Sequence, residues 1–84
     1  MWANLEDLQG DMHVYGSDGK RIGRVGGVFV EIETGRRFLN VTRFGEDLWV
    51  PESAVEPVRL GHDVRLKIRK DEAIRSFSVK PDVV

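Results

Sequence analysis

The sequence predicts a single small all-β domain, a six-stranded barrel with a short helical turn near the C-terminus. Short segments of alternating apolar and polar residues recur along the chain, and glycine-containing turn signals separate them at close spacing. Of the 84 residues, 40% are hydrophobic and 32% are charged, a balance typical of one soluble domain with a small core. We expect an N-terminal arm or short helix over 1–9, the barrel domain over 10–75 and a tail over 76–84.

The first two strands are predicted on either side of a tight turn. Met12–Tyr15 forms the first strand, and Ser17–Gly19 forms the turn because Asp and Gly tolerate positive φ. The second strand begins near Arg21. Its alternation changes phase at Gly26–Gly27, after which a new alternating face begins at Val28. We therefore expect a bulge or sharp bend at this glycine pair, which would curl the sheet towards closure.

The next hairpin is predicted to turn at Thr34–Gly35. If Glu33 pairs with Arg36, Val30 lies opposite Leu39 on the inward face. Alternating apolar residues of both segments then share that face. The register is therefore consistent with one buried side of the sheet.

A further hairpin is predicted to turn at Phe44–Gly45. Pairing Arg43 with Glu46 puts Val41 opposite Leu48, again on the inward face. The inward face thus continues across three strands.

The C-terminal half predicts two more strands, a helix and a tail. Pro51 cannot donate to a ladder, so it ends the preceding strand. Ala54–Leu60 is the next expected strand, and the alternation over Val64–Ile68 predicts a half-buried strand after it. Lys70–Arg75 suits a short helix. We expect the tail to lie on the surface or to be mobile.

Three motifs in order resemble the PRC-barrel family, in particular its short stand-alone members of uncharacterised function. They are the Asp-Gly turn at 18–19 leading to Ile-Gly-Arg-Val at 22–25, the Val-Pro-Glu-Ser-Ala-Val element at 50–55, and the strand at 64–72 that ends in Lys-Asp-Glu. The resemblance implies a compact six-stranded barrel. It also implies a docking role without shared catalytic residues, because family members include the cytoplasmic domain of the photosynthetic reaction-centre H subunit and a domain of a ribosome-maturation factor.

Three aromatic residues fall out of phase with the inward face. Phe29, Phe38 and Trp49 are predicted on the outer side of neighbouring strands. A bare aromatic group of this kind favours a docking or self-association patch. The alternative is a second small core, in which the rings are covered by the N-terminal arm (Trp2, Leu5 and Leu8) or by the tail (Phe77 and Val79).

A basic stripe predicts a second candidate surface. Residues 59–70 carry five basic side chains against one acidic, and the candidate nucleic-acid contacts among them are Arg59, Arg65, Lys67 and Arg69. Such a stripe suits a phosphate backbone, although glutamates on neighbouring strands offer ordinary cross-strand partners. The net charge of −1 argues against wholesale nucleic-acid binding.

The sequence offers no pattern for catalysis or for a cofactor. His13 and His62 lack the spacing of a metal site, and neither Ser17 nor Ser53 lies in a nucleophile elbow. There are no cysteines, and the apolar runs are far shorter than the roughly 20 residues of a membrane helix. We expect no metal, no cofactor, no small-molecule substrate and no membrane partner.

These patterns favour a cytoplasmic, non-catalytic protein-interaction module that binds a protein partner or a second copy of itself. The pathway is not indicated. The alternative is an RNA- or ribosome-associated assembly factor that uses the basic stripe.

Overall fold

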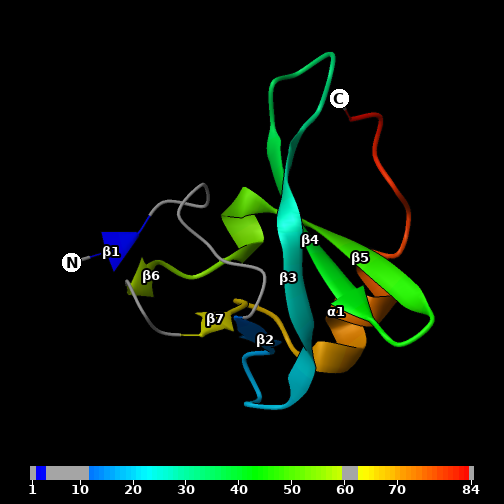
Figure 1. Cartoon of the computed structure of the whole chain (residues 1–84). Coiled ribbons are helices and arrows are strands. Elements are labelled where there is room, and N and C mark those ends of the chain that lie inside the picture. The colour runs from blue at the N-terminus through cyan, green and yellow to red at the C-terminus, as the bar shows by residue number, and fades with distance from the viewer. Residues whose placement is uncertain (1, 4–11, 60–62, 84) are drawn as a thin grey trace.

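The computed structural model describes residues 2–3, 12–59 and 63–83 (Figure 1). The chain forms short strands, one 3-10 helix and one α-helix. In order they are β1 (Trp2–Ala3), β2 (His13–Tyr15), β3 (Arg21–Val30), β4 (Arg37–Arg43), β5 (Glu46–Pro51), η2 (Glu52–Ala54), β6 (Val58–Arg59), β7 (Val64–Arg65) and α1 (Lys70–Ser76). The predicted β-rich fold with a short C-terminal helix is therefore confirmed.

The main sheet has five strands in the order β5-β4-β3-β2-β7, and β1 pairs with β6 in a separate two-stranded sheet. Neighbours in the main sheet run antiparallel, except that β2 and β7 run parallel. The prediction of a closed six-stranded barrel is wrong. The edge strands β5 and β7 are not joined by a ladder in the described part of the chain.

The reason lies in the segment expected to be the fifth strand. Pro51 ends the β5 ladder, η2 follows, and Pro57 removes another backbone donor. Among the described residues, the end of this segment, β6, pairs with β1 rather than with the main sheet. Its remaining pairing is a bridge between Val55 and Leu66. It is flanked by backbone hydrogen bonds from Lys67 to the Ala54 carbonyl (2.8 Å) and from Glu56 to the Arg65 carbonyl (2.9 Å).

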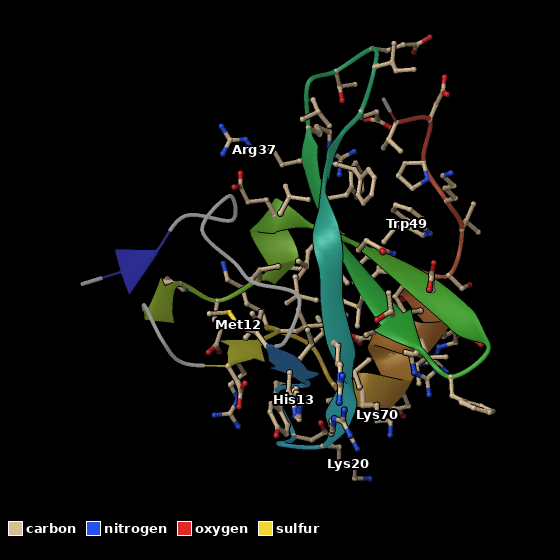
Figure 2. The ribbon with its side chains drawn as sticks, in the orientation of Figure 1. Met12, His13, Lys20, Arg37, Trp49 and Lys70 are labelled. Atoms are coloured by element: carbon tan, nitrogen blue, oxygen red, sulfur yellow. The ribbon has the colours of Figure 1, made fainter. Side chains whose placement is uncertain are left out.

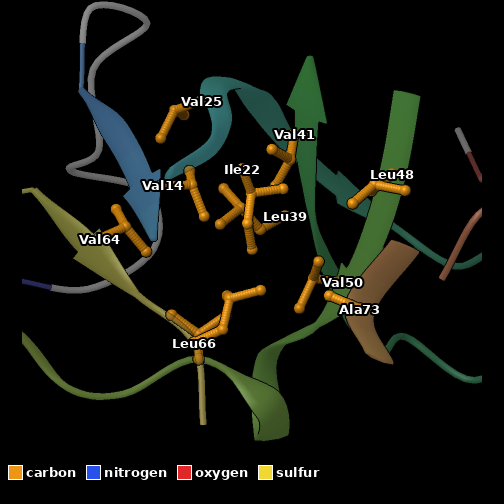
Figure 3. Packing of buried hydrophobic residues seen from close by; sticks show 11 residues of the cluster. Val14, Ile22, Val25, Leu39, Val41, Leu48, Val50, Val64, Leu66 and Ala73 are labelled. Carbon is orange, nitrogen blue, oxygen red and sulfur yellow. The ribbon is translucent and has the colours of Figure 1, made fainter. Parts of the chain in front are cut away.

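The core lies on the inward face of this curved sheet (Figure 3). Its fully buried side chains come from β2, β4, β5 and the segment around β7, and α1 adds Ala73 from the side. The largest of them are Leu39, Leu48, Leu66, Val14, Val41, Val50 and Val64. All of these positions except Val14, for which the sequence analysis assigned no side, belong to the inward parity expected from the sequence.

The predicted bend at Gly26–Gly27 is confirmed as a bulge in β3. Val25 pairs with Val41, but Gly27 pairs with Asn40, so one residue of β3 is left over. A Cβ at position 26 would lie 2.3 Å from the Asn40 Oδ1 atom, and Gly27 has φ +145°. The bulge therefore requires glycine at 26 for space and favours it at 27 for conformation.

The two hairpin registers have different outcomes. The β4–β5 register is confirmed, with Val41 opposite Leu48. The β3–β4 register is wrong by two residues, since Val30 pairs with Arg37 and not with Leu39. The turn is longer than expected because the Glu31 N–H donates to the Arg36 carbonyl at 2.8 Å. A shift of two preserves side-chain parity, so the inward face survives the error.

Replacing Gly26 with alanine should lower the free energy of unfolding by about 1–3 kcal/mol, because the new methyl group would overlap the buried Asn40 side chain. Urea denaturation measures the change. Arg24→Ala, on the exposed side of the same strand, is the control and should change stability little. Equal stability of Gly26→Ala and wild type would contradict the close packing of β3 and β4.

Replacing Leu66 with alanine should cost about 2–5 kcal/mol, because Leu66 is fully buried in the core. The neighbouring Lys67→Ala exchanges an exposed side chain and should cost close to nothing. Thermal and urea melts of the pair separate the two faces of this segment. A similar loss in both variants would mean that burial is not what distinguishes the two positions.

Candidate interaction surfaces

The three predicted aromatic residues form one cluster on the outer side of β3, β4 and β5. Phe29 pairs with Phe38 across the strands, and the Phe29 and Trp49 rings meet edge to face with centroids 5.2 Å apart. Phe38 is only 7% exposed and Trp49 only 9%, while Phe29 is half-buried. The cluster therefore does not present three bare rings to solvent.

The C-terminal tail lies along this cluster (Figure 2). The Trp49 backbone N–H donates to the Phe77 carbonyl at 2.8 Å, and the Lys80 Nζ atom lies 5.4 Å from the centroid of the Trp49 ring. Further along, the Ile32 N–H donates to the Asp82 carbonyl at 2.9 Å. The tail is thus hydrogen-bonded to the sheet at two places and follows the aromatic side of the β3–β4 hairpin.

The side chains expected to make this cover do not all do so. Phe77 packs against the main core, and Val79 is exposed. Lys80 and the tail backbone contact the aromatic cluster in their place. The side chains of the N-terminal arm, including Trp2, lie outside the described residues.

The β3–β4 hairpin projects beyond the core (Figure 1). Val28 still packs against the core, but Val30, the next residue of the same parity, is 43% exposed, and Ile32 in the turn is 57% exposed. The apolar pattern of β3 thus continues past the point where the core ends. This exposed apolar side of the hairpin is called the hairpin face, and its residues are Val30 and Ile32.

The structure describes the side chains of three of the four residues of the predicted basic stripe. Arg65, Lys67 and Arg69 are all exposed, but β7 ends at Arg65 and the chain then turns towards α1. Arg65 Nη2 donates to the Ser17 carbonyl at 3.2 Å, and Arg69 lies 4.0 Å from the Asp71 carboxylate. The Arg59 backbone belongs to β6, and its side chain lies outside the described residues.

A basic group that the sequence did not reveal lies on the outer side of β7, β2 and β3. The sheet register puts Tyr15 between Arg65 on one side and Arg21 on the other. His13 lies opposite Arg24 in the adjacent row. The five residues are called the basic–aromatic face. They come from three separate segments, so only strand pairing could reveal them.

An arginine at the end of β4 extends this surface. Arg43 Nε donates to the Ile22 carbonyl at 3.1 Å, and its Nη1 atom lies 3.3 Å from Glu46 Oε1. Gly23 makes room for this arrangement, since a Cβ there would lie 3.0 Å from Arg43 Cγ and 2.2 Å from the Thr42 carbonyl oxygen. A shallow groove of about 400 Å³ runs here between β3 and β4, with Arg21 and Arg24 in its lining.

The turn below this face is held by Asp18. Desolvation alone would raise the pKa of the Asp18 carboxyl, but hydrogen bonds from the backbone N–H groups of Lys20, Lys70 and Asp18 itself, together with the Lys20 charge, lower that pKa overall. The carboxylate thereby connects the β2–β3 turn to the start of α1.

No cluster of metal-ligating side chains occurs among the described residues, and none of the helices in that part of the chain could cross a membrane. His62 lies outside the described residues, while the His13 backbone N–H donates to Asp63 Oδ1 at 3.0 Å. Ser53 lies in η2, and the Ser17 N–H donates to the Ile68 carbonyl.

Comparison of the chain with protein-family models and with curated proteins finds no match.

Replacing Asp18 with asparagine should lower stability at neutral pH and matter less in acid. The folded state binds the Asp18 proton more weakly than the unfolded chain does. The stabilisation is therefore complete above the ordinary carboxyl pKa of about 4 and is lost as pH falls through the lower folded pKa. Melting temperatures of both proteins between pH 2 and pH 7 test this. A difference that is independent of pH would contradict the role of the charge.

Proposed function

We propose that this chain is a non-catalytic protein-interaction module that binds a second copy of itself through the hairpin face. The observation that carries the proposal is the exposure of Val30 and Ile32 on a hairpin that projects from the core. Apolar residues that continue a buried pattern into solvent favour an interface, because burying them removes apolar surface from water.

A second copy is the occupant that the charges favour. Glu33 and Arg36 lie on opposite sides of the Thr34–Gly35 turn. Two hairpins packed about a two-fold axis can therefore bring the carboxylate of one opposite the guanidinium of the other. Symmetric dimers use such self-complementary patches, in which each residue of one copy meets its complement in the other.

The aromatic cluster supports this surface from behind. Phe29 and Phe38 lie on the hairpin strands, and the edge-to-face contact with Trp49 joins the hairpin to β5. The tail adds a hydrogen bond to Ile32. A hairpin held in this way loses less conformational freedom on binding, which favours association. We therefore assign the three aromatic residues to partner binding through their effect on the hairpin.

The resemblance to the PRC-barrel family agrees with a docking role. It rests on the Asp-Gly turn, the Val-Pro-Glu-Ser-Ala-Val element and the Lys-Asp-Glu strand end, and family members of known role dock onto larger assemblies. The observed sheet is more open than the closed barrel which that resemblance implies. The sequence contains no recognisable nucleophile or ligand pattern.

Sedimentation velocity over a concentration series tests the proposal. The wild type should form a dimer, and Ile32→Glu should raise the dimer dissociation constant more than tenfold, because burying a carboxylate in an apolar interface costs more than about 1.4 kcal/mol. Phe44→Glu is the matched control, since Phe44 is fully exposed at the other end of β4 and should leave the dimer unchanged. A monomer at every concentration would overturn self-association.

A further inference from the structure

We propose that the basic–aromatic face binds single-stranded nucleic acid, with Tyr15 stacking on a base and Arg21, Arg24 and Arg65 contacting the backbone phosphates. This activity is independent of the hairpin face. The hairpin face begins at Val30, the last residue of β3, whereas Arg21 is the first residue of the same strand.

The order of side chains across the sheet favours binding of a single strand. Val14 and Val64 point into the core, so their neighbours Tyr15 and Arg65 lie on the outer side. The strand register places Arg21 opposite Tyr15 on this outer side, and it places Arg24 opposite His13 in the neighbouring row. An aromatic ring flanked by arginines on both sides is the arrangement that single-strand binding surfaces use.

The charges of Arg21 and Arg24 also favour binding of an anion. Within the described part of the chain, neither Arg21 nor Arg24 has a carboxylate partner within ion-pair distance, whereas Arg43 is paired with Glu46. The nearest acidic neighbours by register are Asp47, which pairs with Thr42 beside Arg24, and Asp63, which accepts the His13 backbone N–H. The two arginines therefore remain available to an external anion.

The partial exposure of the Tyr15 and His13 rings favours contact with unpaired bases. Tyr15 and His13 are half-buried, and their ring centroids are 6.5 Å apart with an interplanar angle of 41°. Partly exposed rings at fixed positions can each accept the face of an unpaired base. The groove beside Arg24 continues the surface towards the fully exposed Phe44, which offers a further ring.

These features favour a single strand over a duplex and over an acidic protein segment. A duplex keeps its base faces stacked on one another, so it offers no face to Tyr15, and the described surface has no helix that could enter a groove. An acidic peptide would use the arginines but would leave the ring without a stacking partner. A single strand uses both.

Fluorescence anisotropy with fluorescein-labelled U12 and dT12 oligonucleotides tests the inference. Both should bind the wild type. The logarithm of the association constant should fall with the logarithm of salt concentration with a slope of about −2, as expected for three phosphate contacts on a single strand. Tighter binding of U12 than of dT12 would identify RNA as the preferred strand, and the reverse would identify DNA.

Two variants separate stacking from charge. Tyr15→Leu keeps an apolar side chain and should weaken binding at least fivefold with little change in the salt slope, because one stacked base is lost. The double variant Arg21→Ala, Arg24→Ala should make the slope shallower by about 1.4. Arg75→Ala, at an exposed position in the last turn of α1, is the matched control and should bind like the wild type.

Three results would overturn the inference. They are no binding of either oligonucleotide at low salt, equal affinity for a labelled twelve-residue polyglutamate, and unchanged binding by Tyr15→Leu with an intact thermal melt. If Tyr15→Leu fails to fold, the salt slope of the Arg21→Ala, Arg24→Ala double variant still tests the inference, because both of these side chains are exposed. Ile32→Glu should bind the oligonucleotides normally, so failure of self-association and failure of nucleic-acid binding are distinguishable.

Discussion

The close packing of β3 against β4 at the Gly26 bulge is the contact on which the rest of the structure depends. A side chain larger than hydrogen at position 26 would collide with Asn40, whose own amide donates to the Leu48 carbonyl at 3.1 Å. The bulge bends the longest strand, and the bend allows the sheet to curve around its core. Without that curvature, Val14 and Leu66 could not share one core with Leu48.

The same bend divides β3 into two parts with different surroundings. Before the bulge, β3 pairs with β2, and its outer side carries Arg21 and Arg24. After the bulge, β3 continues into the hairpin, and its outer side carries Phe29 under the tail. One strand therefore supports a charged, open surface at one end and an apolar, covered surface at the other.

The basic–aromatic face and the hairpin face should respond differently to salt. Binding of arginines to phosphates releases counterions, and this release gains less entropy when the salt concentration is high. The basic–aromatic face should therefore bind best at low ionic strength. Burial of Val30 and Ile32 depends on apolar area and is little affected by moderate salt.

The sequence by itself determined which strand positions face the core and where the bulge, the Phe44–Gly45 turn and the C-terminal helix occur. Inward positions such as Leu39 and Val64 followed from alternation, and the bulge, the Phe44–Gly45 turn and the C-terminal helix followed from glycine and from local propensity. Even the two-residue error at the β3–β4 hairpin left the core intact, because strand side chains alternate with a period of two.

Only the tertiary structure decided which segments share a surface. The tail lies against Trp49 through the Phe77 carbonyl and Lys80, a choice between a covered and a bare aromatic cluster that the sequence left open. The parallel pairing of β2 with β7 puts Arg65 beside Tyr15, fifty residues away in the chain. Arg65 lies at the end of β7, whereas Arg69 immediately precedes α1. Strand order depends on the summed energy of long-range contacts, and a periodicity read along the chain holds no information about them.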